Sequence, residues 1–357
     1  MDIVATDKIL LQLIRLALGK EQNRTLPNDV PWFEVLELAD VQGVAAIAAD
    51  GLEQVETEIP FDIKMECAGY IVTNEQMYQL HEKLMVKLAK AYHKKGIRMM
   101  VLKGWGLSFN YPVPCRRPSG DLDIWNFGQW KEADAYLASQ GVEIDNSHHH
   151  HSVFNIKDLT VENHYDFINT RVHRSSRRLE VKLKELAYSD YLEKNVEGVA
   201  IYLPTANFNF LFLLRHMANH FVGKEMTLRQ LLDWALLVEH HHFEIDWEND
   251  LMVLKECGLL RYFNLMALIS VEYLGFSRDI FHCRLEDDDL KERVYKNVIE
   301  PEFNEALGND TVNVILGKVQ RWWSNRWKHK LCYPDSLFSA FIFGVWAKIQ
   351  KPSHFLH

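Results

Sequence analysis

The sequence predicts an α+β fold, in which a small mixed α/β core lies between two helical regions. Short apolar runs that are typical of strands concentrate between about residues 97 and 168, whereas helical periodicity dominates before and after them. We therefore expect a helical N-terminal region (1–95), an α/β core (96–200) and a helical C-terminal domain (201–357).

The N-terminal region contains three segments with helical periodicity. Apolar residues recur with helical spacing between Ile9 and Leu18, between Trp32 and Leu38, and at 78–92, where charges occupy the opposite face. The first segment is interrupted by Gln12 and Arg15 and has no small-residue cleavage site after it. It therefore predicts an amphipathic helix rather than a signal peptide.

The core begins after Gly96, where the apolar period changes. The run from Ile97 to Leu102 predicts a buried strand that turns at Lys103-Gly104 into a helix. Further strands are expected at 122–125, 153–156 and 159–167.

Helical patterns return after Pro204. We expect helices at 208–221 and 228–238, and two more from about 250 to 275 and from 288 to 300. The longest uncharged run lies between Asp335 and Lys348, which is shorter than the roughly 18 to 20 residues that span a bilayer. This run predicts a buried helix and no membrane span.

Charge and cysteine content limit the possible functions. The chain has 40 Lys and Arg against 49 Asp and Glu, a formal net charge of −9, which argues against a long nucleic acid as partner. Its five cysteines are widely spaced without a C-x-x-C motif, which argues against a disulfide framework and a thiolate zinc site. We expect a cytoplasmic protein.

The most informative motif is Asp121-Leu-Asp123-Ile124. In a strand the two carboxylates project from one face about 7 Å apart, while the apolar residues face the other way. Magnesium favours a few carboxylates, with water and phosphate oxygens completing its shell, so this pair predicts phosphate chemistry. An isolated D-x-D is also compatible with a solvated strand edge that has no function.

Two neighbouring segments strengthen the functional interpretation. Upstream, Lys103-Gly104 ends a strand, and a glycine there lets backbone amides approach an anion. Downstream, alternation places Glu162, His164 and Asp166 on one face of a strand, which can supply a third carboxylate.

On these residues the chain resembles the nucleotidyltransferase superfamily of the DNA polymerase β type. Within it, the chain is most similar to an uncharacterised bacterial group related to the aminoglycoside nucleotidyltransferases. The matching segments are the L-K-G turn at 102–104, the R-P-x-x-D-h-D-h motif at 117–124, the acidic-h-His-aromatic segment at 162–165, and the helices that carry His216, His220 and 228–233. The resemblance implies a polymerase-β-like nucleotidyltransferase core with helical N-terminal and C-terminal extensions.

The resemblance also implies roles for individual residues. Asp121, Asp123 and Glu162 would be the catalytic residues and the ligands of two magnesium ions, with His164 as an accessory residue. Five residues would bind the nucleotide: Lys103, Gly104, Arg117, Ser119 and Gly120. The reaction would move a nucleoside monophosphate from a nucleoside triphosphate to a hydroxyl of a small molecule or a protein, with release of pyrophosphate.

Alternatives remain open at this point. Glu180 competes with Glu162 as the third carboxylate, although its surroundings also fit a helix. The same fold could belong to a catalytically inactive nucleotide-binding or interaction protein, such as one component of a toxin–antitoxin pair. The sequence predicts neither the acceptor, the base nor the oligomeric state.

Histidines and basic segments have simpler explanations. The run 148–151 fits a polar loop better than a metal site, although a metal-dependent hydrolase built on histidines is a third option. His216 and His220 share a helical face but lack the glutamate of H-E-x-x-H, which favours burial in the core or hydrogen bonding between helices over a zinc site. The basic segments 171–184 and 318–330 fit a solvated helix and a helix packed on the domain.

Overall fold

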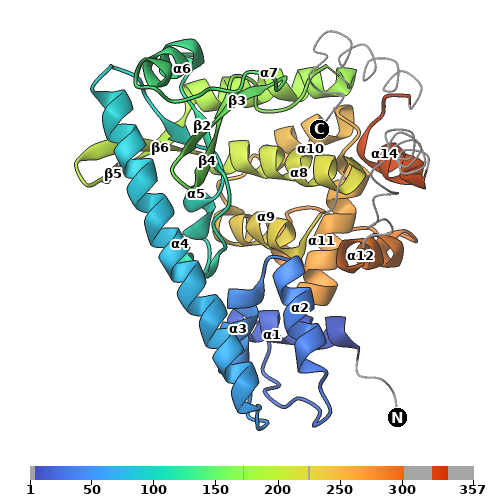
Figure 1. Cartoon of the computed structure of the whole chain (residues 1–357). Helices are drawn as coiled ribbons and strands as arrows, with labels where there is room; N and C mark the ends of the chain where they lie inside the picture. The colour runs from blue at the N-terminus through green and yellow to red at the C-terminus, as the bar shows by residue number, and fades with distance from the viewer. Residues whose placement is uncertain (1–4, 172, 224–225, 301–323, 337–357) are drawn as a thin grey trace, which may run out of the picture.

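The structure is a computed structural model that describes residues 5–171, 173–223, 226–300 and 324–336 (Figure 1). It confirms an α+β fold with a mixed sheet. None of the described helices is both long enough and apolar enough to cross a membrane.

Four helices precede the sheet: α1 (Thr6–Ala17), α2 (Trp32–Val41), α3 (Ala45–Leu52) and α4 (Phe61–His93). The first two were predicted, and the predicted helix at 78–92 is the second half of the much longer α4. Helix α3 was not predicted, because most of its residues are buried and an alanine-rich buried helix has no amphipathic pattern. Helix α4 runs along one side of the molecule from α3 to the sheet (Figure 1).

Six strands occur in the described ranges, and they form one sheet in the order β3-β4-β2-β1-β6-β5. They are β1 (Met100–Val101), β2 (Leu122–Trp125), β3 (His151–Ile156), β4 (Leu159–His164), β5 (Tyr191–Val196) and β6 (Val199–Pro204). The pairs β2–β4 and β1–β6 are parallel, and the other neighbours are antiparallel. The predicted strands at 122–125 and 153–156 are confirmed, and the one expected at 159–167 ends at His164.

The hairpin β5–β6 was not predicted. Its turn has Glu197 and Gly198 at φ 48° and 81°, the two positive values that a tight two-residue hairpin requires. Most residues of β5 are not buried, so the strand lacks the apolar signal that identified the central strands.

The two faces of the sheet pack against different helices. Leu122 and Ile124 belong to a hydrophobic cluster with the C-terminal half of α4 and with α6 (Trp130–Ser139). Trp125 belongs to the other cluster, together with residues of α7 (Arg174–Ser189) and α8 (Ala206–Gly223). The alternation of β2 therefore directs Asp123 away from α4 and towards α8. The sequence predicted the alternation but not the helices that each face meets. The short helices α5 (Trp105–Ser108) and η1 (Pro114–Arg116) connect β1 to β2.

The residues that the structure describes after β6 are mainly helical. Helices α8 and α9 (Leu228–His241) match the predicted segments, and α12 (Lys291–Ile299) matches the last one. The segment expected at 250–275 is two helices, α10 (Trp247–Glu256) and α11 (Leu260–Leu274), because the chain turns at Gly258 with φ 69°. Helix η2 (Arg278–Ile280) follows α11.

The last described helix is α14 (Arg326–Cys332). Lys328 and His329 are buried there, and Trp327 packs against the larger hydrophobic cluster, as expected for a helix packed on the domain. Most of the uncharged run between Asp335 and Lys348 lies outside the described residues, as does the first part of 318–330.

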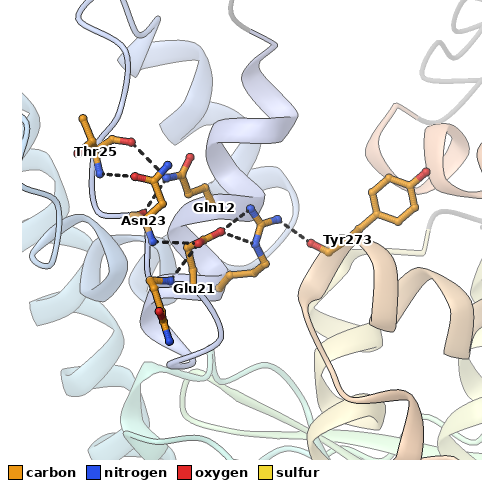
Figure 2. A network of polar contacts seen from close by, with 7 residues as sticks. Gln12, Glu21, Asn23, Thr25 and Tyr273 are labelled. Carbon is orange, nitrogen blue, oxygen red and sulfur yellow. Dashed lines mark hydrogen bonds and ion pairs between the residues drawn. The ribbon is translucent and has the colours of Figure 1, made fainter.

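Polar contacts join α1 to α11 and to the loop that follows α1 (Figure 2). Arg15 donates to the Glu21 carboxylate and, at 3.0 Å, to the carbonyl oxygen of Tyr273 in α11. Glu21 accepts from the backbone N–H of Asn23, and Gln12 donates to the carbonyl oxygens of Asn23 and Thr25. These bonds fix the loop after α1 and join two parts of the chain that also share one hydrophobic cluster.

Candidate active site

The predicted carboxylates lie on two adjacent strands. Strands β2 and β4 are parallel, and their register places Asp123 directly beside Glu162. Asp121 precedes the first residue of β2. The structure therefore brings these three acidic residues to one side of the sheet, where all of them line the same cavity.

This cavity, called the central cavity below, has a volume of about 910 Å³. Strand residues and the Lys103-Gly104 turn form one wall, and helices α8 and α9 form the opposite wall. Besides the acidic residues, its lining includes Lys103, Gly104, Arg117, Gly120, His150, His151, His216, His220, Arg229 and Asp233. Ser119, which was predicted to bind the nucleotide, lies outside the set of described residues that line the cavity.

Asp123 is buried between two cationic groups. Lys103 Nζ donates to its Oδ1 at 2.8 Å, and His164 Nε2 lies 3.0 Å from the same oxygen. Burial alone would raise the pKa of Asp123, but Lys103 and His164 outweigh burial and hold this pKa well below its usual range. Asp123 is therefore a carboxylate anion at any physiological pH.

His164 joins Asp123 to Glu162. Its Nε2 lies 3.4 Å from Glu162 Oε2, and its Nδ1 donates to the carbonyl oxygen of Asp166 at 3.2 Å. Burial opposes the charged imidazole, but the hydrogen bonds to Asp123 and Glu162 outweigh burial and raise the pKa of His164 to about 9. Because both ring nitrogens face oxygens that only accept, the protonated form fits the geometry.

Glu162 and Asp121 differ in their electrostatic environments. Burial would raise the pKa of Glu162, but the hydrogen bond from His164 reverses the direction and lowers it. Burial, together with the nearby charges of Glu162 and Asp123, raises the pKa of Asp121. Three carboxylates thus repel one another at the edge of the cavity, which is the electrostatic condition that a bound cation relieves.

The Lys103-Gly104 turn lies beside the acidic residues. The backbone N–H of Leu102 donates to the carbonyl oxygen of Asp123 at 3.0 Å, which fixes the end of β1 against β2. Gly104 has φ 55° and ψ −109°, a conformation that side chains other than glycine rarely adopt. A Cβ at Gly104 would lie 3.9 Å from the carbonyl oxygen of Asp121, so the turn lies beside the residue that precedes β2.

The guanidinium of Arg117 forms an ion pair with Asp233 of α9. Its Nε and Nη2 donate to the two carboxylate oxygens at 2.7 and 2.8 Å, and Nη1 donates to the carbonyl oxygen of Pro118 at 3.0 Å. Tyr111 donates to the same carboxylate at 2.8 Å. Arg117 lines the cavity, but its guanidinium is occupied in joining the approach to β2 to helix α9.

Sequence reasoning missed Arg229, in the first turn of α9. Its Nη1 lies 3.8 Å from where a Cβ of Gly120 would be, and its Nε is buried without a hydrogen-bond partner among the described residues. Gln42 holds the start of α9, because its Oε1 accepts the N–H of Leu228 at 2.8 Å and its backbone oxygen accepts that of Arg229 at 3.3 Å. The signal in the sequence was a single arginine at the start of an apolar helix.

Glu180, the other candidate for a third carboxylate, does not line the central cavity. It belongs to α7, not to a strand, and its carboxylate accepts the backbone N–H groups of Phe167 and Ile168 at 3.1 and 3.0 Å. It stabilises the segment after β4. Of the two candidates for a third carboxylate, Glu162 is the one beside Asp123.

Histidines from the predicted loop reach the central cavity. The run 148–151 ends at His151, the first residue of β3, and both His150 and His151 line the cavity. Burial lowers the pKa of His150 to about 2 and that of His151 to about 4, so both imidazoles are neutral near pH 7. Two groups of side chains bring potential metal-ligating atoms within 4.8 Å of one another: Asp123, Glu162 and His164, and His150, His151 and His164.

The histidines of α8 face the same cavity. The rings of His216 and His220 lie 4.6 Å apart between centroids, and both residues line the cavity wall opposite the sheet. Burial, followed by the nearby Lys103, lowers the pKa of His216 well below its usual value. This placement, on a cavity wall, was not predicted.

Comparisons with known proteins support one assignment. A family model described as an uncharacterised nucleotidyltransferase matches residues 28–275, which include every residue of the site described above. Searches of curated proteins and of solved structures gave no match. Because the family model covers more than half of the chain, the protein belongs to the uncharacterised nucleotidyltransferase family.

Proposed function

We propose that the protein transfers a nucleoside monophosphate from a nucleoside triphosphate to an acceptor hydroxyl and releases pyrophosphate. One observation carries the proposal: Asp121, Asp123 and Glu162 converge on one wall of a cavity of about 910 Å³ that also contains lysine and arginine. This combination of acidic and basic groups fits a triphosphate and the metal ions that accompany it.

The donor set fits magnesium. Carboxylate oxygens are its preferred protein ligands, and Asp121, Asp123 and Glu162 would hold two ions, leaving other positions for water and phosphate oxygens. When bound, magnesium neutralises charge on the triphosphate and lowers the pKa of the attacking hydroxyl.

The protein's own groups have separate tasks in this proposal. Lys103 and Arg229 bind the triphosphate oxygens, and the Gly104 turn allows the backbone to approach them. Glu162, held as an anion by His164, either completes the metal site beside Asp123 or accepts the proton of the acceptor hydroxyl. Arg117 positions the approach to β2 through its ion pair with Asp233.

The acceptor in this proposal is a small molecule or a protein hydroxyl. A long polynucleotide is disfavoured because the chain carries a net charge of −9.

One observation favours a second candidate, a catalytically inactive nucleotide-binding or interaction protein. Lys103 and His164 both occupy Asp123 Oδ1, so a metal ion must compete with two cationic groups for this oxygen. A protein that only binds nucleotides would keep these contacts.

The experiment uses the full chain, magnesium and each of the four α-labelled ribonucleoside triphosphates, with a metabolite extract as the source of acceptor. We expect label to be transferred to a small molecule or to protein, and the transfer to be lost in Asp121→Asn. The matched control is Asp190→Asn, an exposed carboxylate at the end of α7. Tight nucleotide binding without transfer of any of the four labels would instead support the second candidate.

A further inference from the structure

Three histidine side chains meet next to the acidic residues, and the function proposed above does not use them together. His150, His151 and His164 each present a ring nitrogen, and these nitrogens all lie within 4.8 Å of one another. The rings of His150 and His151 are 4.3 Å apart between centroids, and that of His164 lies 5.7 and 5.2 Å from them.

The backbone holds these histidines together. In the antiparallel pair β3–β4, His151 lies directly opposite His164. The carbonyl oxygen of His150 accepts the N–H groups of Tyr165 and Asp166 at 3.0 and 3.1 Å. The cluster therefore does not depend on one flexible loop, since two strands and their connecting hydrogen bonds define its geometry.

Two of the imidazoles have unused ring nitrogens. The side chain of His151 is only 7% exposed, and neither its Nδ1 nor that of His150 has a hydrogen-bond partner among the described residues. Leaving a buried polar nitrogen without a partner is unfavourable, and a bound ligand would offset this cost. Glu162 Oε2 lies 3.8 Å from His151 Nδ1. This distance is too long for a hydrogen bond but short enough for both atoms to bind the same ion.

We infer that His150 and His151, joined by His164 once a metal ion displaces the Nε2 proton that His164 shares with Asp123, form a binding site for a transition-metal ion of the zinc class, separate in chemistry from the carboxylate site for magnesium. Imidazole nitrogen selects zinc, cobalt and related ions, whereas magnesium prefers oxygen ligands. Three histidines with a nearby carboxylate are a donor set that zinc accepts, with a position open for water or substrate. This inference does not depend on nucleotide transfer.

The test is a titration of the full-length, chelator-treated protein with Co²⁺, followed by the visible ligand-field absorption of the bound ion. We expect one equivalent to bind with the intense bands of a nitrogen-rich site, Zn²⁺ to displace it, and millimolar Mg²⁺ to leave it in place. His150→Gln and His151→Gln should each weaken Co²⁺ binding at least about tenfold. Circular dichroism of each variant checks that the fold is retained.

Two further variants make the outcome decisive. His242→Gln is the control, because His242 and His282 form an exposed pair with nitrogens 2.7 Å apart that could also attract Co²⁺. Loss of the absorption in His242→Gln, displacement by Mg²⁺, or unchanged binding in folded His150→Gln and His151→Gln would overturn the inference. Asp121→Asn should keep the absorption, so failure of nucleotide transfer and failure of this site are separate results.

Discussion

At the scale of single residues, Asp123 shows how the site tolerates a buried charge. A carboxylate that is 6% exposed would be strongly disfavoured if it were alone, but Lys103 and His164 both donate to it. Local charge is thus nearly balanced in a chain whose net charge is −9. Removing the positive charge of Lys103 or of His164 would leave the negative charge of Asp123 less well compensated.

Arg229 provides a test of triphosphate binding. Arg229 lines the cavity, and its buried Nε has no partner in the part of the chain that the structure describes. We therefore expect Arg229→Gln to raise KM for the nucleotide about 10- to 100-fold, the equivalent of one charged hydrogen bond. Steady-state kinetics measures this KM. The control is Arg178→Gln, because Arg178 is an exposed residue of α7. An unchanged KM in Arg229→Gln would remove this residue from the binding site.

Asp250 provides a test of stability against pH. Burial raises its pKa to about 7, and its Oδ2 is buried without a partner among the described residues. A raised carboxyl pKa favours the folded state only below the unfolded pKa near 4, and this advantage is lost as the pH rises through 7. We therefore expect Asp250→Asn to stabilise the protein at pH 8, by up to about 4 kcal/mol, and to have little effect at pH 4.

Denaturant unfolding at both pH values measures this difference. Glu248→Gln, an exposed acid in the same helix, should change little at either pH. Equal effects of Asp250→Asn at pH 4 and pH 8 would contradict the raised pKa.

Local sequence was sufficient for some site residues and not for others. The alternation of β2 and β4 correctly places Asp123 and Glu162 towards one side of the sheet, because the strand period is local. The partner of Arg117 is Asp233, 116 residues away, and no local pattern indicates that pairing. Arg229 and His216 reach the cavity for the same non-local reason, the docking of α8 and α9 onto the sheet.

At the scale of elements, the crossing of α1 and α3 depends on one glycine. A Cβ at Gly51 would lie 1.9 Å from the carbonyl oxygen of Leu13, a backbone atom that cannot move without its helix. We expect Gly51→Ala to destabilise the protein by about 3 kcal/mol or more. Thermal or denaturant unfolding measures the change.

Gly69 offers a matched control. It lies on an exposed part of α4, and a Cβ there meets nothing within 4 Å. Gly69→Ala should therefore stabilise the protein by about 0.5–1 kcal/mol through helix propensity alone. If Gly51→Ala and Gly69→Ala changed the free energy of unfolding in the same direction, this result would contradict the close crossing of α1 and α3.

The sequence predicted those helices and strands that bury apolar residues in a regular pattern. The central strands were found because they are apolar, and β5 was missed because most of its residues remain at least partly exposed. Helix α4 was seen only at 78–92, where buried residues such as Leu84, Leu88 and Tyr92 recur, because its first half has few of them. The apolar period of a sequence indicates which face of a helix or strand is buried. An element that is buried on all sides, or on none, has no such period and is difficult to predict.

At the scale of the whole molecule, the site depends on parts of the chain that are distant in sequence. One hydrophobic cluster contains residues of α1, α3, α8, α9 and α11, and it supports the helices that face the acidic strands. The motif-bearing strands form one wall of the central cavity, and the C-terminal helices form the other. In the proposed function, acceptor specificity would lie on this second wall, with residues such as His216, His220 and Gln230.

The central claim is that the three carboxylates carry out nucleotidyl transfer, and the release of pyrophosphate measures it most directly. With magnesium, the preferred triphosphate and its acceptor, we expect Asp121→Asn, Asp123→Asn and Glu162→Gln each to lower the rate at least about 100-fold. Glu185→Gln, an exposed acid of α7, should keep the wild-type rate. Pyrophosphate release that persisted in a folded Asp121→Asn variant would contradict the proposed function.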